Sequence, residues 1–146
     1  MGKSNSMENG MLLLFFNNTD FANIGDAGGL QNSATAGSLY ISLHTADPGE
    51  AGSQTTSEAN YTSYARVAVA RSGAGFTVTA NAVTNAAAIT FPQCTGGSST
   101  VTHFGVGTDA AGAGTLLYSG ALTAQLAITN NITPNFPAGE LDITEE

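Results

Sequence analysis

From Leu39 onward the chain consists of short runs in which apolar and polar residues alternate, separated by turn-forming residues. The first run, Leu39 to His44, places its large aliphatic residues at every second position, which is the period of a half-buried strand. Asp47-Pro48-Gly49 ends it, because proline presets φ in a turn and glycine accepts a positive φ. Similar runs recur about every 8 to 12 residues, which is typical of an all-β fold.

We therefore predict an all-β fold, an antiparallel β-sandwich of about eight short strands with one short N-terminal helix. Strands do not alternate with helical patterns, so a doubly wound parallel sheet is disfavoured. One strand is expected over 62–70, and two separate strands over 115–118 and 121–129. The apolar members of the runs form the predicted core: Leu39, Ile41, Leu43, Val67, Val69, Phe76, Val78, Ile89, Phe91, Phe104, Val106, Leu116, Leu126 and Ile128.

The single predicted helix covers residues 7–17. Ser4 to Glu8 offers N-cap residues and an acidic first turn, and the asparagines at 17 and 18 end the pattern. The apolar run Met11–Phe16 is too short to span a bilayer, and no small-residue cleavage site follows it. We expect neither a membrane segment nor classical secretion.

The length of 146 residues fits one domain with one core. Within a single domain covering 1–146, we expect an N-terminal helical segment over 1–21. A Gly- and Asn-rich loop follows over 22–38, and the β core occupies 39–146.

Charged residues make up only 10% of the chain, and the net charge is −8. The cations are Lys3, Arg66 and Arg71, which form no basic cluster, so we exclude direct binding to nucleic acid or to an anionic membrane surface. Between Ser72 and Gly139 only Asp109 is charged. Such a stretch can be buried against neighbouring subunits at little desolvation cost, so a homo-oligomer is expected, with a trimer as the specific prediction.

Ser42, His44 and Asp47 have the residue types of a catalytic triad. Triads are assembled from separated elements beside an oxyanion hole, and these three residues are close neighbours in sequence. We therefore predict no catalytic residues and no enzymatic activity. Cys94 is the only cysteine and is interpreted as a small buried apolar residue.

The loop between 47 and 61 carries Asp47, Glu50 and Glu58, whose oxygens are the ligands that calcium prefers. The regular spacing of a calcium loop is absent, so a solvated acidic loop is the preferred interpretation and no metal site is predicted. Arg66 and Arg71 are expected to pair with carboxylates.

Two Gly-x-Gly pairs, at 105–107 and 112–114, have the look of phosphate-binding loops. Neither precedes a helix or a lysine, and both are interpreted as hairpin glycines. No cofactor is predicted. Four tyrosines offer rings that could stack on sugars, although the chain has no tryptophan: Tyr40, Tyr61, Tyr64 and Tyr118.

The ordered series of motifs resembles a family of small structural proteins of tailed bacteriophages, often labelled as tail or tail-fibre proteins. The motifs that carry the resemblance are ENGMLLLFFNNTDF, LYISLHTADPGEAG, NYTSYARVAVAR, ITFPQCTGGSSTVTHFGVG, GTLLYSGAL and FPAGELDIT. The resemblance covers about Glu8 to Thr144 and implies a virion component, assembled in the bacterial host cytoplasm, with no catalytic residues to transfer. The loop from Ala22 to Gly37 is longer than the corresponding loop expected in this family.

Two roles follow from this resemblance. The first is a capsid decoration protein, bound outside the major capsid shell; the trimer is predicted for this role, because a capsid lattice offers three-fold positions. The alternative is a tail, tail-tip or fibre-associated protein that contacts the host. In either role, the partners are other virion proteins. The N-terminal segment is expected to dock on one of them while the 47–61 loop faces solvent or the rim of the interface. The predicted interface residues are Met11, Leu12, Phe15, Phe16 and Phe21.

Overall fold

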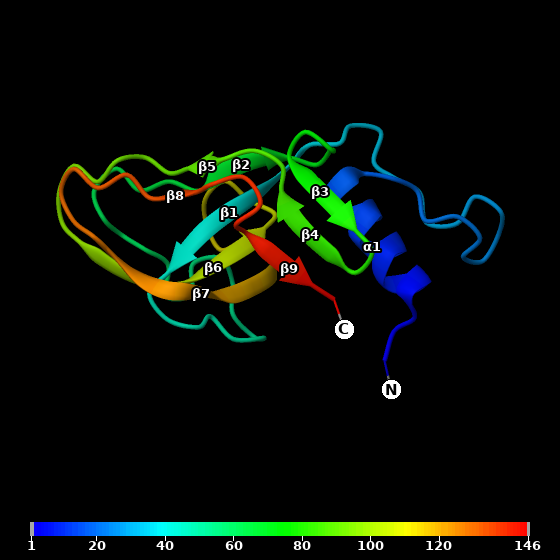
Figure 1. Ribbon diagram of the computed structural model, residues 1–146, viewed down its shortest axis with the longest axis horizontal. Coiled ribbons are helices and arrows are strands. Elements are labelled where there is room, and N and C mark those ends of the chain that lie inside the picture. The colour runs from blue at the N-terminus through cyan, green and yellow to red at the C-terminus, as the bar shows by residue number, and fades with distance from the viewer. Residues whose placement is uncertain (1, 146) are drawn as a thin grey trace. The chain divides into compact units, whose positions relative to one another are not determined.

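The computed structural model describes residues 2–145, which are mostly β with one helix (Figure 1). The elements are α1 (Asn5–Asn17), β1 (Ser38–His44), β2 (Val67–Ala70), β3 (Phe76–Thr79), β4 (Ala82–Asn85), β5 (Ile89–Thr90), β6 (Ser99–Gly107), β7 (Leu116–Ile128), β8 (Asn135–Phe136) and β9 (Asp142–Thr144). They form sheets of order β2-β1-β6-β7, β3-β4-β9 and β5-β8. The prediction of an all-β antiparallel sandwich with one short N-terminal helix is confirmed.

The chain divides into two compact units. Unit 1 comprises Met1–Ser38, Ala70–Ala88 and Phe136–Glu146, and unit 2 comprises Leu39–Val69 and Ile89–Asn135. The prediction that 1–146 forms a single domain stays a prediction. No helix within residues 2–145 has the length and apolar character needed to cross a membrane.

Unit 1 contains α1, which packs on the sheet β3-β4-β9 (Figure 1). The hydroxyl of Ser4 caps the first turn by accepting a hydrogen bond from the Met7 amide at 3.3 Å. Asn18 ends the helix in the left-handed conformation, with φ of 52°, and its amide bonds the Leu13 carbonyl. The predicted helix over 7–17 is confirmed, and it begins at Asn5 because Ser4 is the N-cap.

The core of unit 1 joins the helix to the sheet. Leu12 and Phe16 are fully buried on α1, and the ring of Phe16 meets that of Phe76 edge to face at a centroid distance of 4.9 Å. The β3-β4 hairpin pairs Val78 with Val83, and β9 extends the sheet on the other side of β4. One helical face is thereby covered by the sheet.

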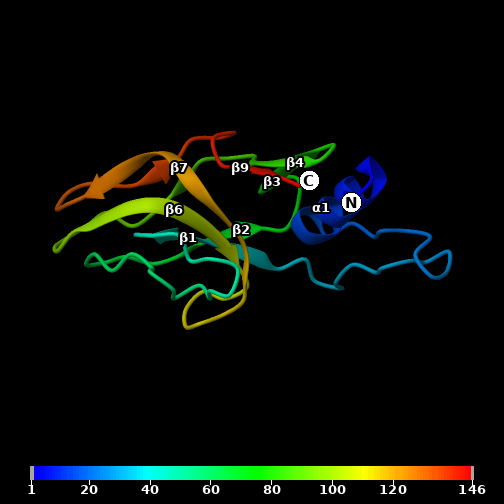
Figure 2. The same cartoon turned by 90° about the horizontal axis from the view of Figure 1, so that it is seen from below.

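Unit 2 contains the four-stranded sheet, in which β6 is paired antiparallel with both β1 and β7. Figure 2 shows β6 and β7 as a curved pair. The predicted strand from Leu39 to His44 is confirmed. The prediction that this strand is half-buried is wrong, however, because Ser42 and His44 are as fully buried as Ile41. Both faces of β1 are therefore covered.

Two predicted strand boundaries are corrected. The strand expected over 62–70 is confined to Val67–Ala70. The two strands expected over 115–118 and 121–129 are one strand of 13 residues, β7. The pairing of β7 with β6 shifts register twice, between Ala121 and Leu126 opposite the Val101–His103 step, and between Leu116 and Tyr118 opposite the Val106–Gly107 step.

Nine of the fourteen predicted core residues are buried: Leu39, Ile41, Leu43, Phe76, Ile89, Phe91, Phe104, Val106 and Ile128. Val67, Val69, Val78 and Leu116 are half-buried. The prediction that Leu126 belongs to the core is wrong, since its side chain is 37% exposed. It lies on the outermost strand beyond the register shift, where the period of the sequence no longer follows the inner face.

Candidate functional site

The polar residues singled out from the sequence fall into three groups in unit 2: a buried Ser–His pair, a buried ion pair, and a groove. Ser42 and His44 share one face of β1, and Ser42 Oγ lies 2.8 Å from His44 Nε2. Gly105, paired with Ser42 across the sheet, makes room for them. A Cβ at Gly105 would lie 2.6 Å from both of these atoms.

The hydrogen bonds around the Ser42–His44 pair indicate a structural role. His44 Nδ1 lies 2.8 Å from the Thr56 carbonyl oxygen, so the neutral ring donates there and accepts from the Ser42 hydroxyl at Nε2. Burial lowers the pKa of His44, which favours this neutral form. Asp47 does not join the pair, because its Oδ1 accepts from the Gly49 amide at 2.9 Å. The three triad-like residues are therefore not assembled.

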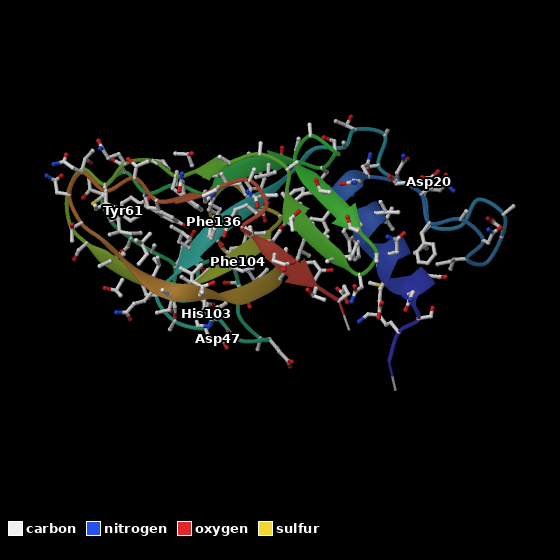
Figure 3. The ribbon with its side chains drawn as sticks, in the orientation of Figure 1. Asp20, Asp47, Tyr61, His103, Phe104 and Phe136 are labelled. Atoms are coloured by element: carbon white, nitrogen blue, oxygen red, sulfur yellow. The ribbon has the colours of Figure 1, made fainter. Side chains whose placement is uncertain are left out.

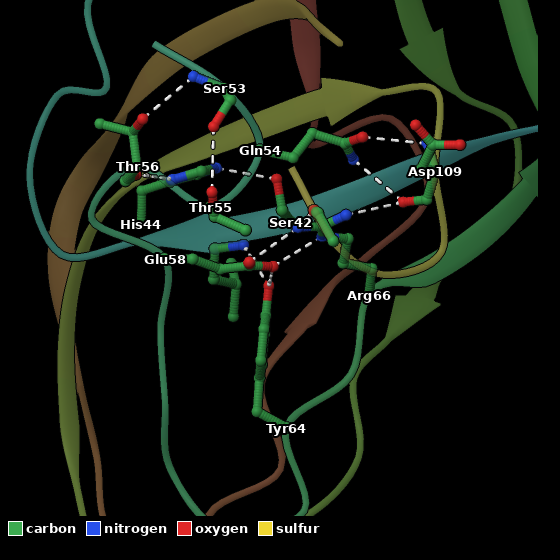
Figure 4. Close-up of polar contacts among 12 residues, drawn as sticks. Ser42, His44, Ser53, Gln54, Thr55, Thr56, Glu58, Tyr64, Arg66 and Asp109 are labelled. Atoms are coloured by element: carbon green, nitrogen blue, oxygen red, sulfur yellow. Dashed lines mark hydrogen bonds and ion pairs between the residues drawn. The ribbon is translucent and has the colours of Figure 1, made fainter. Parts of the chain in front are cut away.

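The second group is the ion pair between Arg66 and Glu58 (Figure 4). Arg66 Nε lies 2.7 Å from Glu58 Oε1, and Nη2 lies 2.8 Å from Oε2. The Tyr64 hydroxyl donates to the same carboxylate at 3.0 Å and accepts from the Leu43 amide. The hydrogen bond to Glu58 raises the pKa of Arg66, and burial raises the pKa of Tyr64. The predicted carboxylate partner of Arg66 is confirmed.

Arg66 also ties a hairpin to this pair. Its guanidinium donates to the carbonyls of Asp109 at 2.9 Å and Gly112 at 2.7 Å, in the turn between β6 and β7 (Figure 4). The fully buried side chain of Gln54 is hydrogen-bonded to the same turn. Its Oε1 accepts from the Asp109 amide, and its Nε2 donates to the Asp109 carbonyl. Two side chains, Arg66 and Gln54, thus hold the turn.

The Gly-x-Gly pair at 105–107 lies inside β6 and is not a hairpin, which corrects the sequence interpretation. A Cβ at Gly107 would lie 2.1 Å from Gln54 Cδ, so only a glycine at this position leaves room for the Gln54 side chain beside β6. Sequence reasoning missed Gln54. Two glycines on one face of a strand were the available signal that another segment approaches closely there.

The 47–61 loop is consequently a folded part of unit 2. Gln54, Ala59 and Tyr61 are buried, and Glu58 is held by Arg66. The prediction of a solvent-facing loop is wrong over this part. Asp47 and Glu50, in contrast, are exposed.

Arg71 has different partners from those predicted. In unit 1 it donates to the carbonyls of Leu14, Phe15 and Ala36 at 2.7, 2.7 and 3.0 Å. Two of these belong to the last turn of α1, where carbonyls lack helical partners and a cation is favoured. The arginine therefore fastens the C-terminal end of the helix.

The third group lines a groove of about 560 Å³ in unit 2 and includes Asp47 and His103. Figure 3 labels these two residues. The walls of the groove are the Asp47–Gly52 part of the loop and the β7 segment Leu116–Ala121. Asp47 and Glu50 both line it, whereas Glu58 is paired with Arg66, so the three candidate calcium ligands do not form one site. Across residues 2–145, no group of three or more His, Cys, Asp or Glu side chains is arranged to hold a metal ion.

The tyrosines considered for sugar stacking divide by burial. The Tyr61 hydroxyl donates to the Pro92 carbonyl at 2.9 Å, and burial raises its pKa to about 12. Tyr64 stacks on Phe91 at 6.4 Å between centroids and meets the Tyr61 ring at 5.3 Å, so both rings are part of the core. Tyr118 lines the groove, and Tyr40 is half-buried on β1.

The five predicted interface residues differ in exposure. Leu12 and Phe16 are fully buried inside unit 1 and are corrected to core residues. Met11 and Phe21 are half-buried, and Phe15 is 37% exposed. Phe21 packs over Gly10 of the helix, where a Cβ would lie 2.5 Å from its ring. That the remaining three form an interface stays a prediction.

Cys94 is fully buried, and its thiol donates to the Gly96 carbonyl at 3.3 Å. This confirms the interpretation of Cys94 as a small buried side chain.

These features describe a β-rich protein whose polar side chains hold its loops. The sequence resembles small structural proteins of tailed bacteriophages, and comparison with protein families tests that resemblance. The model of one family, described as podophage GP4 fiber I protein gp80, matches residues 2–144. The chain belongs to this family, which confirms the tailed-phage resemblance. A search among curated proteins returned no match.

The family match bears on the two roles differently. Its description as a fibre protein supports the alternative role, a tail or fibre-associated protein, and does not support capsid decoration. The first-choice role is therefore set aside in favour of the alternative.

Proposed function

We propose that this protein is a non-enzymatic structural component of the tail fibre of a tailed bacteriophage, held in the virion by contacts with other virion proteins. The observation that carries the proposal is the family match over residues 2–144. The buried state of the Ser42–His44 pair agrees with it, since a substrate has no access to these side chains.

The expected homotrimer rested on the three-fold positions of a capsid lattice. A fibre role removes that reason, so we propose only that copies of the chain assemble with one another or with other virion proteins. The number of copies in a fibre is then set by the fibre's symmetry and not by the capsid lattice.

We further propose that α1 supplies the attachment surface. Met7, Met11 and Phe15 follow one another at four-residue intervals and so lie along one side of the helix. Met7 and Phe15 are 38% and 37% exposed, whereas Leu12 and Phe16 hold the helix on unit 1. An exposed apolar stripe on a rigidly held helix is suited to docking in the groove of a neighbour.

The location of the protein tests the proposed function. Gold-labelled antibody against a folded surface epitope, applied to intact particles, is expected to mark the tail and its fibres. The same antibody on particles separated into heads and tails should recover the protein in the tail fraction. Labelling spread over the head, or recovery with the heads at hundreds of copies per particle, would return the protein to the decoration role.

A further inference from the structure

The loop over residues 18–33, which follows α1 in unit 1, holds a defined shape although little of it is buried. Residues 22–28 and 30–35 are all exposed. In Figures 1 and 2 the loop extends beyond α1 on the side away from β3 and β4. Ordering an exposed segment costs conformational entropy that burial does not offset, and long loops of this kind usually have a function. The 18–33 loop is therefore a candidate binding element.

Hydrogen bonds within the 18–33 loop fix its shape. At its base, the Asn18 side chain donates to the Ser33 carbonyl at 2.8 Å and accepts from the Ser33 amide at 2.9 Å. Phe21 and Leu30 pair through two main-chain hydrogen bonds of 2.9 Å. Near the tip, Asp26 Oδ1 accepts from two backbone amides at 2.8 and 3.0 Å. A loop already held in one shape loses little entropy when it binds.

Two contacts fasten the 18–33 loop to α1. The ring of Phe21 packs over Gly10 of the helix, where a Cβ would lie 2.5 Å from it. The guanidinium of Arg71 donates both to carbonyls in the last turn of α1 and to the carbonyl of Ala36, just after the loop. The helix and the loop therefore present one rigid surface.

The apolar stripe of α1 continues onto this loop. The stripe consists of Met7, Met11 and Phe15. Gly10 lies three residues after Met7 and so borders the stripe on the helix surface. Phe21 packs on Gly10 and is half-buried, so part of its ring extends the stripe towards the loop.

Beyond Phe21 the loop itself carries apolar and acidic side chains. Leu30 is 44% exposed and Ile24 is 37% exposed. Asp20 and Asp26 are exposed beside them, and no lysine or arginine occurs between positions 4 and 65. An apolar surface bordered by carboxylates is complementary to an apolar patch that is bordered by Lys or Arg.

We propose that the 18–33 loop and the apolar stripe of α1 form one docking surface for another virion protein, which meets it with an apolar patch bordered by Lys or Arg. The proposal rests on the attachment role proposed for α1. The apolar side chains supply most of the affinity, and Asp20 and Asp26 select the charge of the partner.

Charge argues against a second copy of this chain as the partner. Its cations are engaged, since Arg66 is bonded to Glu58, Arg71 to carbonyls of α1, and Lys3 lies 2.8 Å from Glu145. Each copy also carries a net charge of −8. Two such surfaces would repel each other, so a protein of different composition is the better fit.

The double substitution Ile24→Gln, Leu30→Gln tests the part played by the loop. It should lower the amount of protein in purified particles about tenfold, as expected when two apolar anchors of an interface are lost. The thermal midpoint of the isolated protein should change little, because both side chains are exposed. Ile132→Gln is the matched control, since Ile132 is 39% exposed in unit 2. Full incorporation of the loop variant, or an equal loss in the control, would overturn the proposal.

Photocrosslinking in complete particles identifies the partner. Benzoylphenylalanine at Leu30 and, in separate particles, at Phe15 should crosslink to the same virion protein, whereas the same residue at Ile132 should not. A Leu30 crosslink to a second copy of this chain, to a glycan or to a protein that Phe15 does not reach overturns the proposal. A Phe15 crosslink without a Leu30 crosslink overturns this inference alone. Loss of both overturns the attachment role of α1 as well.

The charge of the partner is tested at the same position. Asp20→Asn with Asp26→Asn keeps the Oδ1 acceptors that bond the loop amides and removes both charges. The Leu30 crosslink yield should then fall several-fold, and the crosslinked peptide, sequenced by mass spectrometry, should lie beside a Lys or Arg of the partner. An undiminished yield would show that the partner is not selected by charge and would overturn that part of the proposal.

Discussion

Arg66 and Glu58 form a bidentate ion pair in which the arginine side chain is 3% exposed and the glutamate side chain 15% exposed. The pair joins the 47–61 loop to the segment that leads into β2, and the remaining guanidinium donors reach the hairpin at Asp109 and Gly112. One residue thereby connects three separate parts of unit 2.

The first prediction concerns this pair. Arg66→Met leaves the Glu58 carboxylate buried without its cation and should lower the free energy of unfolding by about 3 to 5 kcal/mol. Urea denaturation followed by circular dichroism measures the change. Arg66→Lys should recover less than half of the loss, because a lysine cannot reproduce the bidentate contact and two carbonyl bonds together. Full recovery by lysine would show that charge alone matters here.

The second prediction concerns Gly107 and Gln54. Gly107→Ala places a methyl group 2.1 Å from Gln54 Cδ and should destabilise the protein by about 1 to 3 kcal/mol. Gln54→Ala removes the obstacle, so the double variant should be less destabilised than the sum of the single variants. Gly73→Ala is the control, since its Cβ meets nothing within 4 Å. Additive losses at 107 and 54 would contradict the contact.

The third prediction is a pH dependence. Burial lowers the pKa of His44 below 6.5, so the unfolded chain binds more protons than the folded one between the two pKa values. The stability from neutral His44 is complete above pH 6.5 and declines as the pH falls through the lowered pKa. Urea midpoints measured between pH 7.5 and 5 should fall with acidity, and His44→Gln should flatten that dependence. An equal slope in the variant would exclude His44 as the group responsible.

The fourth prediction separates docking from folding on α1. Phe15→Gln and Met11→Gln should reduce incorporation into particles while the thermal midpoint of the isolated protein changes little, because Phe15 is exposed and Met11 half-buried. Leu12→Ala should instead destabilise the protein by about 2 to 5 kcal/mol, since Leu12 is fully buried. Quantitative immunoblots of purified particles and thermal denaturation provide the two readings. Full incorporation of the Phe15 and Met11 variants would place the attachment surface elsewhere.

Local sequence was sufficient for the fold class and the helix. Period-two alternation from Leu39 onward predicts strands, and Ser4 and Asn18 bracket the one helix because capping is a contact among near neighbours. The composition likewise excluded a basic binding surface, since three cations cannot form one wherever the fold places them.

Tertiary structure decided which polar residues are buried and what they hold. His44 and Thr56 are 12 residues apart, and Gln54 and Asp109 are 55 apart, so no local pattern relates them. Alternation alone assigned His44 to a solvent face, yet the 47–61 loop folds over that face and supplies the carbonyl that its ring requires. Long-range pairing also set the register shift beyond Ala121, after which Leu126 is exposed, because the register of a strand is a property of its neighbour as much as of its own sequence.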